Sequence, residues 1–107
     1  MPNRSEPEYL YLTTTGWKTG KPHEIEIWFT ERDRCYYLVS EGGERAHWVQ
    51  NVRRQARVTF RVGQRNFHGL GRVVDAAGEP ELHAAVSQLS IEKYDWGEGL
   101  IVELFPD

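Results

Sequence analysis

Apolar and polar residues alternate along several short stretches of this chain, and such alternation is typical of half-buried β-strands. The clearest stretch spans residues 24–29, where Ile25, Ile27 and Phe29 would share one face of a strand. The other face is polar except for Trp28, which we expect to cover a ligand or to contact another subunit. A strand with one polar face is typical of an antiparallel sheet that is open to solvent on one side.

Residue types and turn signals extend this pattern to six strands and two short helices. The strands are expected at residues 9–15, 24–29, 35–40, 57–62, 65–74 and 100–105, and the helices at residues 46–54 and 80–90. The strand at 65–74 contains Gly69 and Gly71, which indicate a bend or a close approach of another backbone. Sequential antiparallel strands with bending glycines predict a mainly β (α+β) chain that forms a small barrel or a strongly coiled sheet.

The composition is that of one globular domain, expected at residues 9–107 after a flexible polar tail at residues 1–8. A formal net charge of −3 argues against a general nucleic-acid binder. Cys35 is the single cysteine, which excludes an internal disulfide and a cysteine-based zinc cluster and favours a reducing, cytoplasmic setting. The four histidines lack metal-ligand spacing, and no apolar run approaches the ~20 residues of a membrane span.

The first candidate ligand site is the turn expected between the first two strands. Gly16 and Gly20 favour a tight turn, and Lys18, Thr19 and Lys21 place two ammonium groups and a hydroxyl on it. Such a turn suits an anionic group of a ligand. The alternative is an ordinary hairpin turn whose lysines are only solvated.

The second candidate is the sequence Ser-Glu-Gly-Gly at residues 40–43, directly before the first expected helix. Adjacent glycines and a helix N-terminus together offer backbone N–H groups to a phosphate or a carbonyl oxygen. Glu41 and Glu44 argue against a strong anion site there, and a Gly-Gly turn before a helix is common. Because the chain offers no evident nucleophile or general acid, an enzyme of this kind would rely on a bound cofactor for its chemistry.

In their order and spacing, these stretches resemble the deazaflavin (F420)-dependent nitroreductase family of the FMN-binding split β-barrel superfamily. The resemblance rests on Leu-Thr-Thr-Thr-Gly-Trp-Lys-Thr-Gly-Lys-Pro at residues 12–22 and on Ser-Glu-Gly-Gly at residues 40–43, followed by Trp48 and Asn51. It continues through Val-Thr-Phe-Arg-Val-Gly at residues 58–63. The ordered combination is more specific than any one of these pieces.

The resemblance implies a six-stranded antiparallel split β-barrel with two short helices. It implies an oxidoreductase that binds coenzyme F420, a deazaflavin with a phosphate and an acidic tail, and transfers a hydride to or from a quinone, an enone or a nitroaromatic. By the family's pattern, Lys18, Thr19 and Lys21 would contact the phosphate and the tail. The remaining positions that would line the phosphate and ring site are Ser40, Glu41, Gly42, Gly43, Trp48 and Asn51.

The resemblance also implies a homodimer with the coenzyme at the subunit interface, and Trp28, Tyr36 and Tyr37 would supply aromatic surface to it. The family commonly has Arg where Trp17 and His23 stand, so this chain carries fewer permanent charges for a polyanionic tail. Relatives with the same barrel bind FMN, haem or biliverdin. An FMN-binding reductase and a non-catalytic carrier or sensor of a tetrapyrrole or other apolar ligand are therefore the alternatives.

Overall fold

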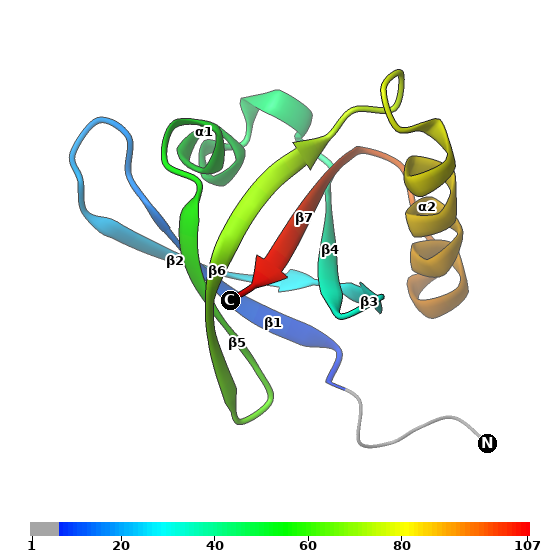
Figure 1. The fold of residues 1–107 in the computed structure, drawn as a ribbon, viewed down its shortest axis with the longest axis horizontal. Coiled ribbons are helices and arrows are strands. Elements are labelled where there is room, and N and C mark those ends of the chain that lie inside the picture. The colour runs from blue at the N-terminus through cyan, green and yellow to red at the C-terminus, as the bar shows by residue number, and fades with distance from the viewer. Residues whose placement is uncertain (1–6) are drawn as a thin grey trace.

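The computed structural model describes residues 7–107, in which seven strands form one sheet flanked by two α-helices (Figure 1). The expected tail at residues 1–8 lies outside the described residues except for its last two positions. The strands are β1 Tyr9–Thr15, β2 Pro22–Trp28, β3 Thr30–Arg32, β4 Cys35–Ser40, β5 Arg57–Val62, β6 Arg65–Val74 and β7 Leu100–Pro106. The helices are the short 3₁₀ helix η1 Gly43–Arg45, α1 His47–Arg54 and α2 Pro80–Tyr94.

The sheet has the order β2-β1-β5-β6-β7-β4-β3, and every neighbouring pair is antiparallel. Its two edge strands, β2 and β3, follow each other in the chain with only Phe29 between them. The sheet therefore curls until one bent segment forms both of its edges. This confirms the expected split-barrel fold class, with seven strands instead of six. The sequence pattern missed β3 because three residues, two of them exposed and charged, carry no readable alternation.

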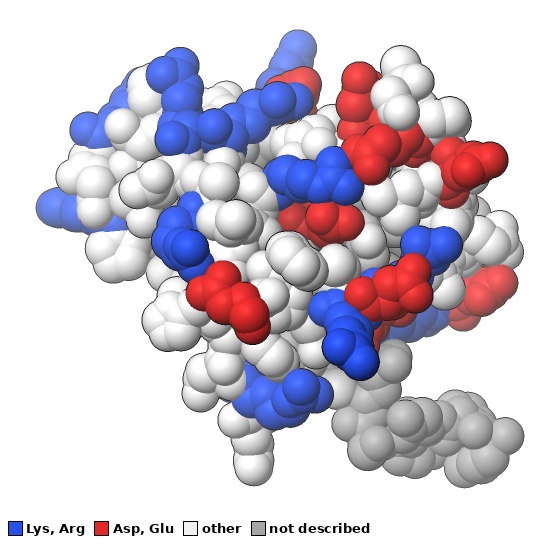
Figure 2. Space-filling view, in the orientation of Figure 1, with Lys and Arg blue, Asp and Glu red and all other residues white. Residues whose placement is uncertain are grey.

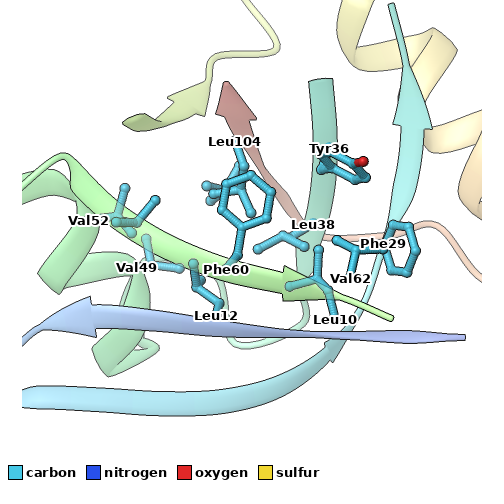
Figure 3. Close-up of a cluster of buried hydrophobic side chains, with 12 residues drawn as sticks. Leu10, Leu12, Phe29, Tyr36, Leu38, Val49, Val52, Phe60, Val62 and Leu104 are labelled. Atoms are coloured by element: carbon cyan, nitrogen blue, oxygen red, sulfur yellow. The ribbon is translucent and has the colours of Figure 1, made fainter. Parts of the chain in front are cut away.

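The main core fills the concave side of the sheet (Figure 3). Tyr36 from β4 packs against Phe60 and Phe67, with ring centroids 5.4 and 5.5 Å away. The expectation that Tyr36 and Tyr37 offer surface to a second subunit is wrong, because their residues are only 2% and 3% exposed. Tyr36 faces the main core, whereas Tyr37 packs in a second cluster with Val86 of α2. A strand covered on both faces reads as a continuous apolar run, as β4 does.

Two glycines in β6 allow the close packing that their positions predict. A Cβ atom on Gly69 would collide with the carbonyl oxygen of Phe105 on β7. A Cβ atom on Gly71 would lie 3.0 Å from the Cγ1 atom of Val52. Val52 belongs to α1, so Gly71 lets this helix approach the sheet closely.

Helix α2 covers the other side of the sheet and ends at the bend between β2 and β3. The helix continues four residues beyond its expected end at Ser90. The hydroxyl of Tyr94 accepts a hydrogen bond from the Phe29 N–H at 3.0 Å and lies 2.7 Å from the carbonyl oxygens of Glu8 and Phe29. The ammonium of Lys93 donates to the Phe29 carbonyl at 2.9 Å. These contacts stabilise both the bend and the last turn of the helix.

The Tyr94 hydroxyl leads to the first prediction. Replacing Tyr94 with Phe keeps the ring but leaves the N–H of the buried Phe29 without its partner, so we expect a loss of about 1–2 kcal/mol in the free energy of unfolding. Urea denaturation measures this change. The matched control is Tyr11→Phe, which removes a hydroxyl that bonds to the exposed Glu26 at 2.8 Å and should change stability little. Equal effects of the two substitutions would contradict a special role for Tyr94.

Candidate functional site

The turn between β1 and β2 is held by its own backbone. The Gly16 N–H donates to the Lys21 carbonyl, and the Gly20 N–H donates to the Gly16 carbonyl, both at 2.7 Å. Gly20 has a φ of +74°, which favours glycine. Gly16 has no room for a side chain, because a Cβ atom would lie 2.8 Å from Nε2 of His23. The turn is therefore closed at its base and presents the exposed Lys18 at its tip.

The predicted anion-binding residues of this turn divide into two groups. Lys18 and Thr19 line a hollow of about 500 Å³ beside α1. Lys21 does not line it, and its backbone N–H donates to the Thr19 hydroxyl at 3.2 Å, which places that hydroxyl within the turn. We call this cavity the turn hollow; residues that line it include Trp17, Lys18, His47, Trp48, Gln50 and Asn51.

A cation that the sequence analysis did not assign to this site comes from α1. The guanidinium carbon of Arg54 lies 4.6 Å from the centroid of the Trp17 ring, and the ammonium of Lys18 lies 5.0 Å from it. Trp17 thus holds two cations next to the turn, at a position where Arg is common in the family that the sequence resembles. Figure 2 shows basic side chains gathered over this end of the molecule and acidic ones over the α2 end. The signal was the spacing of Asn51 and Arg54, which places them on one helix face.

Asn51 connects α1 to the turn. Its residue is buried, its Oδ1 accepts a hydrogen bond from the Trp17 N–H at 3.1 Å, and its Nδ2 donates to the Thr14 hydroxyl at 3.1 Å. Because the Trp17 N–H can only donate, the side-chain amide of Asn51 must turn its oxygen toward Trp17 and its nitrogen toward Thr14. Asn51 therefore lines the turn hollow while both of its polar atoms bond to the protein, and it acts on the site chiefly by holding the turn in place.

The segment at residues 40–43 does not lead directly into a helix N-terminus. Ser40 donates its hydroxyl to the Gly43 carbonyl at 3.2 Å, Gly43 begins η1, and α1 starts only at His47. Ser40, Glu41 and Gly42 line a second hollow, whereas Gly43 lines a separate one beside the end of β6 and the start of β7. The structure thus brings together three of the four predicted residues.

The charge of Glu44, which argued against an anion site in this segment, is offset locally. Its carboxylate pairs with the Arg53 guanidinium at 2.7 Å, and both side chains are largely exposed. Glu41 lies in the wall of the second hollow.

We call this second hollow, which is about 600 Å³ in volume, the aromatic hollow. Residues that line it include Tyr9, Trp28, Ser40, Trp48, Tyr94 and Trp96. The rings of Trp28 and Tyr94 are stacked, with centroids 4.4 Å apart and planes 3° apart, and Trp96 meets Trp28 edge-on at 6.3 Å. Trp48 lines both hollows, so they adjoin at this residue. Large apolar hollows with a few polar groups are typical ligand sites.

Tyr37 also lines the aromatic hollow, but it is a poor proton donor. Burial raises the pKa of its hydroxyl far above the usual value, and the hydrogen bond that it donates to Glu103, 2.8 Å long, raises the pKa further. Burial likewise raises the pKa of the Cys35 thiol, so this cysteine stays protonated and is unreactive at neutral pH. In residues 7–107, no three His, Cys, Asp or Glu side chains are grouped to hold a metal ion.

The position of Asn51 leads to a second prediction. Asn51→Ala leaves the Trp17 N–H without its acceptor, so we expect a loss of about 1–3 kcal/mol in stability and faster hydrogen exchange at the Trp17 amide. Thermal unfolding and exchange measured by NMR test both effects. The control is Gln50→Ala on the same helix, because the Gln50 side chain bonds only to an exposed carbonyl at Glu44. Unchanged exchange at Trp17 would show that Asn51 does not hold the turn.

Comparisons with known proteins agree with this architecture. A solved F420-H2 dependent reductase, FDR-A, is 20% identical, with a TM-score of 0.75 over 97% of this chain and 99% of that one. HutZ, the heme storage protein of Vibrio cholerae, is 16% identical, with a TM-score of 0.79 over 97% and 84%. An FAD-binding protein of Mesorhizobium loti is 17% identical, with a TM-score of 0.72 over 94% and 82%. At these identities the likeness establishes the fold alone.

A search of curated proteins finds no match to this chain. The family model of the F420H2-dependent quinone reductases matches residues 3–99, which is most of the chain and contains both hollows. This match agrees with the deazaflavin-family resemblance of the turn and of residues 40–43. The chain therefore belongs to the F420H2-dependent quinone reductase family.

Proposed function

We propose that this protein is an oxidoreductase that binds coenzyme F420 and passes a hydride between it and an electron-poor small molecule such as a quinone, an enone or a nitroaromatic. The observation that supports this most strongly is the pair of adjoining hollows with Trp48 in both walls. One hollow is flanked by cations and the other is walled by aromatic rings. A molecule with an anionic tail and a planar ring fits such a pair.

In this proposal, the turn hollow would bind the anionic part of the coenzyme and the aromatic hollow would bind its planar ring. Lys18 and Arg54 would attract the phosphate and the acidic tail, and Asn51 would hold the turn that carries Lys18. The Ser40–Gly42 backbone and Trp48 would contact the planar ring, and the aromatic wall would keep water from it. When bound, the deazaflavin supplies the hydride chemistry, which none of these side chains can supply.

Flavin and tetrapyrrole binding are the second candidates, and the shared fold supports them. The similar structures include one described as FAD-binding and one described as a heme storage protein. Deazaflavin, flavin and haem have distinct visible spectra, so titration of the purified protein with each compound separates the three.

We also propose a cytoplasmic setting for this protein. Within residues 7–107, no helix is long and apolar enough to cross a membrane.

The third prediction tests the anion site. Lys18→Ala removes a charge-assisted hydrogen bond to the tail, so we expect a roughly ten- to hundredfold weaker affinity for F420 at low salt. The loss should shrink as salt rises, and also for a deazaflavin fragment without phosphate and tail. Fluorescence titration measures these affinities. Because Lys18 is exposed, the protein should remain folded.

Two variants serve as controls for this titration. Glu24 lines the same hollow and opposes an anion, so Glu24→Gln should strengthen binding. His83→Ala changes α2, which we propose to be structural and remote from the coenzyme, and should leave the affinity unchanged. If Lys18→Ala binds F420 as tightly as the unmodified protein at low salt, the turn is an ordinary hairpin turn.

We also propose a homodimer, as the family resemblance implies. The exposed side chains of Leu70 on β6 and Phe105 on β7 lie directly opposite each other and form an apolar patch that a second copy would cover. Sedimentation equilibrium at micromolar concentration should give about twice the 12.4 kDa chain mass. Phe105→Asp should shift the equilibrium toward monomer, whereas the same apolar-to-charged change at the exposed Ile91 of α2 should not. A monomer at these concentrations contradicts the proposal.

A further inference from the structure

Thr30 carries an unexplained polar group in the wall of the aromatic hollow. The residue is 5% exposed and opens β3 directly after the bend at Phe29, opposite Tyr37 on β4. Its hydroxyl is the one buried side-chain nitrogen or oxygen within residues 7–107 that has no hydrogen-bond partner. Buried hydroxyl groups without partners are costly and uncommon, so this one requires an explanation.

The neighbouring hydroxyls of the hollow already have partners. Ser40 donates to the Gly43 carbonyl, Ser90 donates to the Trp96 carbonyl at 2.6 Å, and Tyr37 donates to Glu103. Among these lining residues, Thr30 therefore carries the buried hydroxyl that has no partner within the protein.

The surroundings of Thr30 define the shape of that ligand. Trp28, two residues earlier on the other side of the bend, is stacked on Tyr94 and still 37% exposed, so a further planar ring can extend the stack. Because Thr30 lines the same hollow as the stacked rings, its hydroxyl could donate to an oxygen atom carried by such a ring. A flat conjugated molecule with a carbonyl group satisfies both conditions.

We propose that the Thr30 hydroxyl donates a hydrogen bond to a carbonyl oxygen of the electron acceptor, a planar quinone that extends the Trp28–Tyr94 stack. This rests on the proposed function and identifies the acceptor's place within it. The Ser40–Gly42 segment assigned to the coenzyme begins three residues from Tyr37 along β4, about 10 Å away. Thr30 and that segment line the same hollow at this separation, so the acceptor would lie beside the coenzyme ring.

The test is Thr30→Val, which keeps the shape of the side chain and suits a strand. Equilibrium dialysis without coenzyme compares 1,4-naphthoquinone with naphthalene, which has the same ring system and no carbonyl. We expect about tenfold weaker binding of the quinone and unchanged binding of naphthalene. Because the unliganded hydroxyl has no partner, Thr30→Val should also raise the melting temperature.

Thr14→Val is the matched control for stability. The hydroxyl of Thr14 is equally buried but accepts a hydrogen bond from Asn51, so its removal should lower the melting temperature. If Thr30→Val lowers the melting temperature as well, the Thr30 hydroxyl has a partner in the free protein and the proposal is wrong. Equal changes for quinone and naphthalene, or no change for either, also overturn it.

A final comparison separates this proposal from the function on which it rests. If Thr30→Val weakens F420 binding and leaves quinone binding intact, the hydroxyl contacts the coenzyme ring and the acceptor assignment fails. If the quinone result is as expected but the unmodified protein does not bind F420, the Thr30 contact stands and the proposed coenzyme is wrong.

Discussion

The bend at Phe29 is the constraint on which the rest of this structure depends. On one side of this residue β2 pairs with β1, and on the other side β3 pairs with β4. The same piece of chain therefore forms both edges of the sheet. A bent strand of this kind needs partners for the backbone groups at the bend, and Tyr94 and Lys93 provide them from the end of α2. The same contacts therefore hold the bend and dock the end of α2 against it.

The aromatic hollow exists because of the same bend. Trp28 and Thr30 flank Phe29, and the end of α2 that holds the bend also places Tyr94 against the Trp28 ring. The turn hollow has a different origin, because Asn51 ties α1 to the β1–β2 turn. Trp48 lies on that same helix and lines both hollows. Helices, strands and short turns, and not long loops, thus shape the candidate site.

The candidate site contains groups that can bind a ligand but few that are reactive. Cations lie at the turn, and aromatic rings line the second hollow. The ion pairs of Arg72 with Glu79 and Glu103 lie on the outer face of the sheet. Tyr37, which lines the aromatic hollow, and Cys35 on the same strand are held in their neutral forms by burial. Such a protein can orient and select partners for a cofactor that brings its own reactivity.

The sequence by itself determined the features that local patterns encode. Alternation, residue types and turn signals placed six strands and both helices, and Gly69 and Gly71 indicated close packing. The ordered stretches at residues 12–22, 40–43 and 58–63 carried the family resemblance. Only the tertiary structure decided that β3 is a separate strand and that Asn51 bonds to Trp17 and Thr14. It also placed Arg54 over Trp17 and left the Thr30 hydroxyl without a partner. These features depend on contacts between residues far apart in the chain, and periodicity and spacing report only on neighbours.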